Sequence, residues 1–256
     1  MKKTAYILAT VMLIAALSGC NSNSGSDESK DGKVTQVLFQ TPEEPDTTDQ
    51  AVAYLKTQVP LFAKYLETRM QYPLTYETEV QTSEGTMKAA IYIKSDSEIC
   101  FSSTDTKGFT TRTIYAGKKV YSIMDEDRII YEGETTKKAV KEVVEDNLLK
   151  IDYSEASFMA YETSEAPDYY NDVLYNHEII YTQPGKGVHY YFDVNTDDLV
   201  YVVLEDSVTK VTRLDNEVSE DPFSLPMGYE TKPLEEYFAE LAAEQAAAQT
   251  AEQASE

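Results

Sequence analysis

The chain has 256 residues, of which 22 are basic and 45 acidic, and its formal net charge is −23 at pH 7. That balance excludes two classes of partner: nucleic acid, whose binders present basic patches to phosphates, and anionic lipid held by a polybasic segment. The length suits one domain of ordinary size with flanking segments.

The N-terminal segment has the pattern of an export signal. Lys2 and Lys3 precede an apolar run over residues 5–16, shorter than the roughly 20 residues that a membrane-spanning helix needs. The run is followed by Leu17, Ser18, Gly19 and Cys20, so small residues stand directly before a cysteine. We therefore expect residues 1–19 to be a signal peptide; a plain secretory signal that happens to contain a cysteine is the alternative.

Residues 17–20 resemble the bacterial lipobox. The resemblance implies that Cys20 is linked to diacylglycerol, carries acyl chains such as palmitate, and becomes the first residue of a mature lipoprotein. Two acyl chains suffice for stable anchoring, so we expect a protein held on the extracytoplasmic face of a cell membrane. Residues 20–46 are mostly Ser, Asp, Glu, Lys, Gly and Thr, which predicts a disordered tether after the anchor.

A helical pattern opens the predicted folded domain, residues 47–230. Apolar residues recur at steps of four, three, four and four, the spacing of one helix face, at Leu55, Val59, Phe62, Leu66 and Met70. Pro60 interrupts this pattern, because a proline inside a helix removes a hydrogen bond and clashes with the preceding turn. We expect either a kink there or two helices, with Pro60 in the first turn of the second.

From Leu74 the apolar period changes to two, which is typical of antiparallel strands with one buried face. The first group of predicted strands is 74–82, 87–93, 99–101, 109–115, 120–124 and 129–132. A second group follows a loop around Pro167 and comprises 173–182, 188–194, 199–205 and 208–214. Gly-, Asp- and Asn-containing turns separate the strands.

A second helix is predicted between the two strand groups. Thr135 or Thr136 can cap its start, and its apolar stripe consists of Ala139, Val140, Val143, Val144 and Leu148. After the second strand group, residues 231–256 form an Ala/Glu-rich tail. Residues 234–256 hold eight alanines, six glutamates and no basic residue, so a partly helical, solvated tail is expected.

Few residues suggest catalysis or a metal. A tight hairpin around Gly185 and Gly187 would put His189 opposite Tyr181, four residues or roughly 13 Å along the sheet from His177, too far to share a metal ion. Residues 193–197 resemble the start of a calcium loop, but Asp198 stands where Gly is required, so a hairpin turn is favoured. No nucleophile elbow, phosphate loop or metal motif is present. We expect no enzyme, no metal and no cofactor.

Tyrosine is in excess, with 20 residues and no tryptophan. Many fall in the second strand group: Tyr169, Tyr170, Tyr175, Tyr181, Tyr190, Tyr191 and Tyr201. Sheet packing is the favoured explanation, and an apolar pocket or a sugar- or peptide-binding face is the alternative. Cys100 has no intramolecular partner once Cys20 is acylated, and is expected to be a packed thiol rather than a nucleophile.

Three short segments resemble the LolA-like superfamily, which includes lipoprotein-localisation factors and LppX/LprG-type lipid-carrying lipoproteins. The segments are Ile114–Tyr121, like the family's strand–G-[DK]-x-[VL]-Y turn; Tyr191–Val203, like its F-D-x-x-T-x-x-[LP]-V hairpin; and Asp221–Tyr229, like its closing F-x-[LI]-P-x-G-[YF]. Soluble localisation factors are not lipidated, so the chain is not their direct equivalent.

The resemblance implies an α+β, mainly β fold for residues 47–230. In that fold an incomplete, strongly curved antiparallel barrel, here of about ten strands, carries two or three helices across its concave side. It also implies that acyl chains or another hydrophobic ligand lie between sheet and helices. The candidate ligand-facing residues are apolar side chains of the helix stripes and of one strand: Leu55, Phe62, Leu66, Ile91, Ile93, Val140, Val144 and Leu148.

Two functions therefore stay open. The first is a monomeric, membrane-anchored lipoprotein that binds a lipid or other hydrophobic ligand. The second is a non-enzymatic interaction or sensor module, whose filled core presents a Tyr-rich surface to a protein or cell-wall partner. A cavity above about 300 Å³ beneath the helices favours the first, and a filled core with an exposed aromatic patch favours the second.

Overall fold

The structure is a computed structural model that describes residues 48–148, 160–164, 166–183, 186–204 and 207–242. The predicted signal peptide, Cys20, the tether and the end of the tail lie outside these residues. Within the described ranges, no helix combines the length and the apolar character that crossing a membrane requires.

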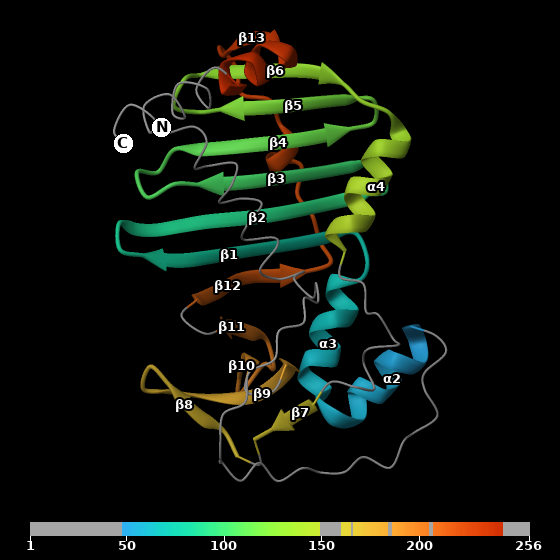
Figure 1. Cartoon of the computed structure of the whole chain (residues 1–256), viewed down its shortest axis with the longest axis vertical. Helices are drawn as coiled ribbons and strands as arrows, with labels where there is room; N and C mark the ends of the chain where they lie inside the picture. Colours follow the sequence, from blue (N-terminus) through green and yellow to red (C-terminus); the bar gives the residue numbers. More distant parts are fainter. Residues whose placement is uncertain (1–47, 149–159, 165, 184–185, 205–206, 243–256) are drawn as a thin grey trace, which may run out of the picture.

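One curved sheet of thirteen strands, open rather than closed into a barrel, dominates the described part of the chain (Figure 1). The strands are β1 (Leu74–Thr82), β2 (Gly85–Ser95), β3 (Glu98–Thr104), β4 (Thr110–Ala116), β5 (Lys119–Met124), β6 (Ile129–Glu134), β7 (Ala160–Thr163), β8 (Asp168–Tyr170), β9 (Val173–Gln183), β10 (Lys186–Asp193), β11 (Leu199–Leu204), β12 (Ser207–Asp215) and β13 (Glu230–Pro233). Their order is β13-β6-β5-β4-β3-β2-β1-β12-β11-β10-β9-β7, and β8 also pairs with β9. The predicted mainly β class with a curved antiparallel sheet is confirmed; among the described strands, only β13 pairs in parallel, with β6.

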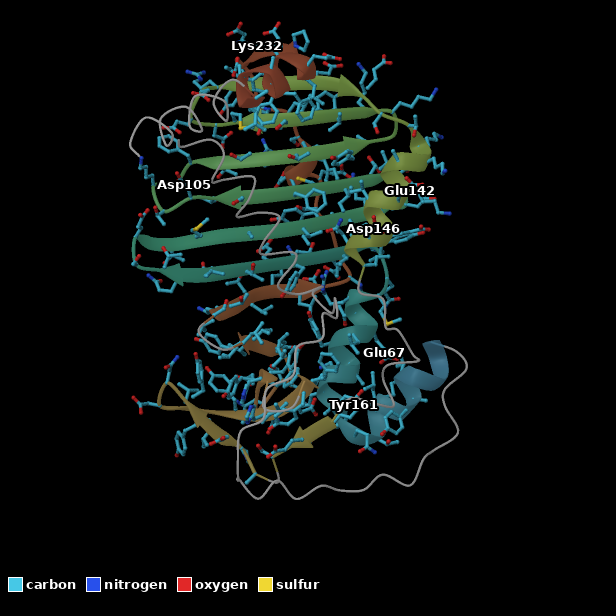
Figure 2. All side chains as sticks on the ribbon, in the orientation of Figure 1. Glu67, Asp105, Glu142, Asp146, Tyr161 and Lys232 are labelled. Carbon is cyan, nitrogen blue, oxygen red and sulfur yellow. The ribbon has the colours of Figure 1, made fainter. Side chains whose placement is uncertain are left out.

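The helices are distributed along the sheet (Figure 1). They are α2 (Thr48–Gln58), α3 (Pro60–Arg69) and α4 (Lys137–Asn147), with a 3-10 turn η1 (Asp221–Phe223), and residues 234–242 are also helical. α3 packs against the half of the sheet that holds β9–β12, and α4 packs against the half that begins with β1–β3. Glu142 and Asp146 lie on the exposed side of α4 (Figure 2).

Both helix starts follow from local sequence. α2 ends at Gln58 and Pro60 is the first residue of α3, so the second of the two expected outcomes is correct. Proline suits this position, because the first helical N–H has no intrahelical partner and the fixed φ is already helical. The predicted cap of α4 is Thr136, whose side-chain oxygen accepts a hydrogen bond from the Ala139 N–H at 3.1 Å.

Two hydrophobic clusters lie on opposite faces of the sheet. The larger one lies between the helices and the concave face, and the smaller one is centred on Cys100, Ile114, Ile123 and Ile130. The segment from Asn216 to Tyr229 covers the smaller cluster as it leads from β12 to β13, with Phe223 and Tyr229 packed on it. The expectation of one buried face is therefore incomplete, because this half of the sheet is covered on both sides.

Cys100 is fully buried in the smaller cluster. Its Sγ lies 3.3 Å from the Pro222 carbonyl oxygen. Burial raises the pKa of the thiol to about 12, so the thiolate that a nucleophile requires is suppressed. The structure thus places Cys100 as a packed thiol.

Three strands, β7, β8 and β13, were not predicted. β7 and β8 are four and three residues long, which is too short for a visible alternation, and both pair with β9. β13 consists of Glu230, Thr231, Lys232 and Pro233, and it has no apolar period. These strands are specified by their partners and not by a local pattern.

The predicted separation of the two histidines is wrong. The β9–β10 register differs by two residues from the expected one and contains a bulge between Lys186 and Gly187, so that His189 lies opposite Ile179 and Tyr191 opposite His177. His177 Nε2 and His189 Nδ1 are consequently 3.0 Å apart. Gly187 permits this register, because a Cβ there would lie 2.6 Å from the Ile179 Cγ2.

The residues that resemble a calcium loop form the β10–β11 turn. The Asp193 carboxylate accepts hydrogen bonds from the N–H groups of Asn195 and Thr196, at 2.8 and 3.1 Å. These bonds hold the pKa of Asp193 below its ordinary value. Asp197 adopts a left-handed φ of 59° to close the turn. The Asp193 side chain is therefore engaged in turn formation, as the hairpin interpretation predicts.

Candidate functional site

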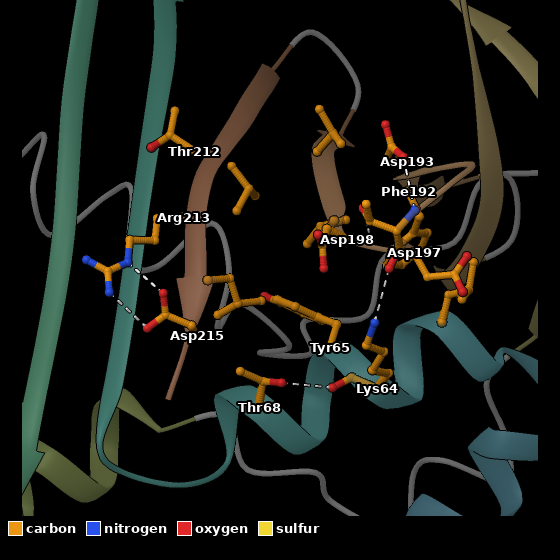
Figure 3. Close-up of a pocket in the computed structure, with 16 residues that line it drawn as sticks. Lys64, Tyr65, Thr68, Phe192, Asp193, Asp197, Asp198, Thr212, Arg213 and Asp215 are labelled. Atoms are coloured by element: carbon orange, nitrogen blue, oxygen red, sulfur yellow. Dashed lines mark hydrogen bonds and ion pairs between the residues drawn. The ribbon is translucent and has the colours of Figure 1, made fainter. Parts of the chain in front are cut away.

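A cavity of about 460 Å³ lies between α3 and the strands β10, β11 and β12 (Figure 3). Its apolar lining comes from both layers: Leu61, Tyr65, Phe192, Leu199, Val200, Val211 and Leu214. Its polar lining lies along α3, the β10–β11 turn and the end of β12: Lys64, Thr68, Asp193, Thr196, Asp197, Asp198, Thr212, Arg213 and Asp215. The buried part of the lining is therefore apolar, and its exposed part is polar and charged.

Glu178 of β9 positions α3 over this cavity. Its side chain is fully buried, and its carboxylate accepts hydrogen bonds from the Leu61 and Phe62 N–H groups at 3.1 and 2.7 Å. The residue before the helix, Val59, provides no side-chain cap. Burial raises the pKa of Glu178, and the two backbone hydrogen bonds oppose that rise. A carboxylate from the sheet thus satisfies the free N–H groups of the first helical turn.

Aromatic side chains join α3 to β10 beside the cavity. The centre of the Phe62 ring lies 4.7 Å from that of Tyr190 and 5.7 Å from that of Tyr65. The ring centres of Tyr65 and Tyr190 are 5.9 Å apart. Tyr65 belongs both to the cavity lining and to the large buried cluster. Through Tyr65, this group adjoins the cavity.

The rim carries more acidic than basic side chains. Arg213 is paired with Asp215, with nitrogen–oxygen distances of 2.6 and 3.2 Å. Lys64 donates to the Thr196 carbonyl oxygen at 3.5 Å, so this lysine spans the mouth from α3 to the β10–β11 turn. The polar side chains at the mouth thus include one ion pair, Arg213 with Asp215, and one contact from a side chain to the backbone, Lys64 to Thr196.

The structure brings the eight candidate ligand-facing residues into one cluster on the concave side. Leu55, Leu66, Ile91, Ile93, Val140 and Val144 are buried in it, and Phe62 and Leu148 pack against it. None of the eight lines the cavity. The cavity lining and the buried cluster share four residues and are thereby connected: Tyr65, Phe192, Leu199 and Val211.

Sequence reasoning missed the cavity lining and two buried polar residues behind it, Arg69 and Tyr76. Arg69 follows Phe62 by seven residues and Leu66 by three, so it lies on the apolar face of α3. A charged residue on the apolar face of a predicted helix could have indicated that Arg69 is buried. Tyr76 carried no signal, because its alternation with polar neighbours is that of any half-buried strand.

The opposite face of β8–β11 carries a second aromatic group. Tyr191 stacks on His177 at 4.4 Å and on Tyr170 at 4.6 Å, and Tyr175 and Tyr201 contact them. At the β8–β9 hairpin, Tyr169 is 68% exposed and Val173 is 50% exposed. Most of this tyrosine cluster is sheet packing, and an exposed apolar patch is confined to the hairpin.

The sequence matches no family model, and no curated protein matches it significantly. Among solved structures, an uncharacterized conserved protein from Thermus thermophilus is similar over 68% of this chain and 97% of its own, at 11% identity and a TM-score of 0.37. MucB is similar over 68% of this chain and 64% of its own, at 11% identity and a TM-score of 0.39. MucB has also been solved in complex with MucA from Pseudomonas aeruginosa. LprF from Mycobacterium bovis is similar over 67% of this chain and 96% of its own, at 8% identity and a TM-score of 0.37.

Proposed function

We propose that the chain is a membrane-anchored extracytoplasmic lipoprotein that binds a lipid or other amphiphile between α3 and the sheet. The observation that carries the proposal is the cavity of about 460 Å³ beneath α3. Its volume falls within the roughly 300–1,000 Å³ that is usual for small-molecule sites. Binding, and not catalysis, is the proposed activity.

The chemistry of the lining favours an amphiphile over a wholly apolar ligand. The inner walls are Leu, Val, Phe and Tyr side chains, whereas the mouth holds Lys64, Arg213 and several aspartates. A hydrocarbon chain would replace water along the inner walls, which is favourable in proportion to the apolar area buried. A polar group would remain near the mouth or meet a polar partner inside.

The lipobox-like residues 17–20 support the anchoring part of the proposal. Diacylated Cys20 would hold the chain on the outer face of a membrane, and residues 21–46 would separate the sheet from the bilayer surface. Once Lys2 and Lys3 are removed with the signal peptide, the chain has 20 basic and 45 acidic residues and a formal charge of −25. Such a charge disfavours close contact with anionic lipid head groups.

Native mass spectrometry tests ligand binding directly. The chain from residue 20 onward, with Cys20→Ser to leave it unacylated, is purified without detergent. We expect an added acyl-containing mass that delipidation removes and added lipid restores. A ligand-free mass that ignores added phospholipids and fatty acids would contradict the proposal.

The exposed β8–β9 hairpin supports a second function, a surface interaction module. Leu174 is 39% exposed beside Tyr169 and Val173, so an apolar patch continues across the hairpin. Exposed aromatic and aliphatic side chains of this kind are typical of protein contacts. A ligand-free mass in the experiment above, together with loss of a partner on Tyr169→Ser, would favour this function.

A further inference from the structure

Arg69, at the end of α3, is a buried guanidinium without a neutralising partner among the described residues. The residue is 3% exposed, and its Nε and Nη1 have no hydrogen-bond acceptor. Its Cζ lies 4.4 Å from the centre of the Tyr76 ring. A cation–π contact compensates only part of the cost of burying a charge, and arginine is seldom buried unless it is paired.

Tyr76 presents a second polar group at the same place. The residue is 2% exposed, and its hydroxyl makes no hydrogen bond of normal geometry within the described ranges. Burial and the nearby Tyr65 hydroxyl raise its pKa well above the ordinary value, so the group stays a neutral O–H donor. Unsatisfied donors on two neighbouring side chains point to an acceptor that the described residues do not supply.

Arg69 and Tyr76 adjoin residues that line the cavity. Thr68, which lines the cavity, precedes Arg69 on α3, and Leu214, which also lines it, is opposite Tyr76 in the β1–β12 pairing. Tyr65 lies between the cavity and Tyr76, because it lines the first and its hydroxyl approaches that of the second. A turn of the Tyr65 side chain would open the cavity toward both donors, and side-chain changes of that size are common on binding.

We propose, on the basis of the proposed function, that Arg69 and Tyr76 bind the anionic oxygen head group of an acidic amphiphile. The head group, a carboxylate or a phosphate, accepts hydrogen bonds from the guanidinium and from the Tyr76 hydroxyl. Its hydrocarbon chain lies along the apolar walls formed by Phe192, Leu199 and Val211. Ionised acceptors form the strongest hydrogen bonds with guanidinium groups, so this site would select acids over neutral lipids of equal chain length.

Equilibrium binding of palmitate, hexadecanol and lysophosphatidic acid tests the site, because these ligands share a hydrocarbon chain and differ in the head group. We expect the unacylated chain to bind an acid more tightly than hexadecanol. In Arg69→Met, we expect binding of that acid to weaken by roughly 10- to 100-fold, the loss of a charged hydrogen bond, with hexadecanol unchanged. Tyr76→Phe should give a smaller loss for the acid alone. The palmitate and lysophosphatidic acid arms identify the head group as carboxylate or phosphate.

Arg128→Met is the matched control, because Arg128 also lies over a tyrosine ring, 5.7 Å from Tyr229, but is exposed. It should leave all three affinities unchanged. In the unliganded chain, Arg69→Met should raise the midpoint of urea unfolding, since it removes an unpaired buried charge. If an acid of the chain itself neutralised Arg69, the same variant would lower that midpoint, because the acid would be left unpaired.

The outcomes separate this inference from the proposed function. Wild-type binding of all three ligands with equal affinity, or an equal loss for acid and alcohol in Arg69→Met, would overturn the head-group site and leave ligand binding intact. A lowered unfolding midpoint in Arg69→Met would also overturn it. Binding of none of the three by the wild-type chain would contradict both proposals.

Discussion

The stacked histidines illustrate how the register of two paired strands decides which side chains meet on a surface. The His177 ring lies 5.1 Å from that of His189 and almost parallel to it, and its Nδ1 is 3.7 Å from an Asp168 carboxylate oxygen. Burial and the nearby His189 lower the pKa of His177, whereas Asp168 and Glu162 oppose that shift. The folded state therefore favours neutral His177.

The lowered pKa predicts a pH-dependent stability. In the unfolded chain the pKa of His177 is about 6.5. Below that pH the unfolded state therefore binds more protons than the folded state. The stability contributed by His177 is present above pH 6.5 and is lost as the pH falls through its lower folded pKa. The free energy of unfolding in urea should fall less between about pH 7 and about pH 5.5 for His177→Gln than for the wild-type chain. An equal loss in both would contradict the assignment.

At the residue scale, the sequence predicted which side chains are buried better than it predicted which side chains contact each other. The apolar candidates such as Ile93 and Val144 are buried together, because their spacing alone places them on inward faces. The histidine pair could not be predicted, since the β9–β10 register, which contains a bulge at Gly187, differs by two residues from that of a tight hairpin. Arg69 lies on a predicted inward face, but its lack of a partner is a property of the packed interior.

At the scale of elements, the hydrogen bonds from α3 to Glu178 join helix and sheet across 116 residues or more of chain. Glu178→Ala would leave the Leu61 and Phe62 N–H groups without their acceptor. Because hydrogen bonds to charged groups contribute about 1.5–3 kcal/mol, we expect a loss of about 2 kcal/mol in the free energy of unfolding, with a smaller loss for Glu178→Gln.

Denaturant unfolding measures this effect, and Glu162→Ala is its control. Glu162 is exposed on the neighbouring strand β7 and accepts a hydrogen bond from the Tyr181 hydroxyl at 3.0 Å. Its removal should change the free energy of unfolding by less than about 0.5 kcal/mol. Equal effects of the two alanine substitutions would show that the Glu178 hydrogen bonds do not stabilise α3.

Most elements could be predicted because each has a local signal. Pro60 set the boundary between α2 and α3, Thr136 capped α4, and period-two runs gave the ten longer strands. β13 could not be predicted, because Glu230–Pro233 has no alternation and gains its structure from parallel pairing with β6. The cavity was also beyond prediction, since its walls come from α3 and three strands at once.

At the scale of the whole molecule, the sheet separates two environments. The concave side holds the large cluster and the cavity, and the opposite face of β2–β6 is covered by the segment that crosses from β12 to β13. Arg112 holds that segment with hydrogen bonds to the Pro222 and Ser224 carbonyl oxygens, both 3.0 Å. Ligand binding is therefore expected on one side of the sheet only.

Membrane attachment is a separate prediction for the whole chain. In a bacterial host, palmitate labelling should mark the wild-type protein and place it in the membrane fraction, because two acyl chains give stable anchoring. Cys20→Ala should abolish both, whereas Cys100→Ala, which removes the buried thiol, should leave both unchanged. Labelling that persists in Cys20→Ala would contradict anchoring through this residue.

The central claim, a ligand held between α3 and the sheet, is tested most directly by filling the cavity. Leu61 lines it from α3, whereas Leu225 is 44% exposed in the segment that covers the opposite face. The measurement is the acyl-containing mass bound per chain in Leu61→Trp, with Leu225→Trp as control, after both are shown to unfold at the wild-type midpoint. We predict that bound mass is largely lost in Leu61→Trp and retained in Leu225→Trp. Equal retention in both would contradict binding at this cavity.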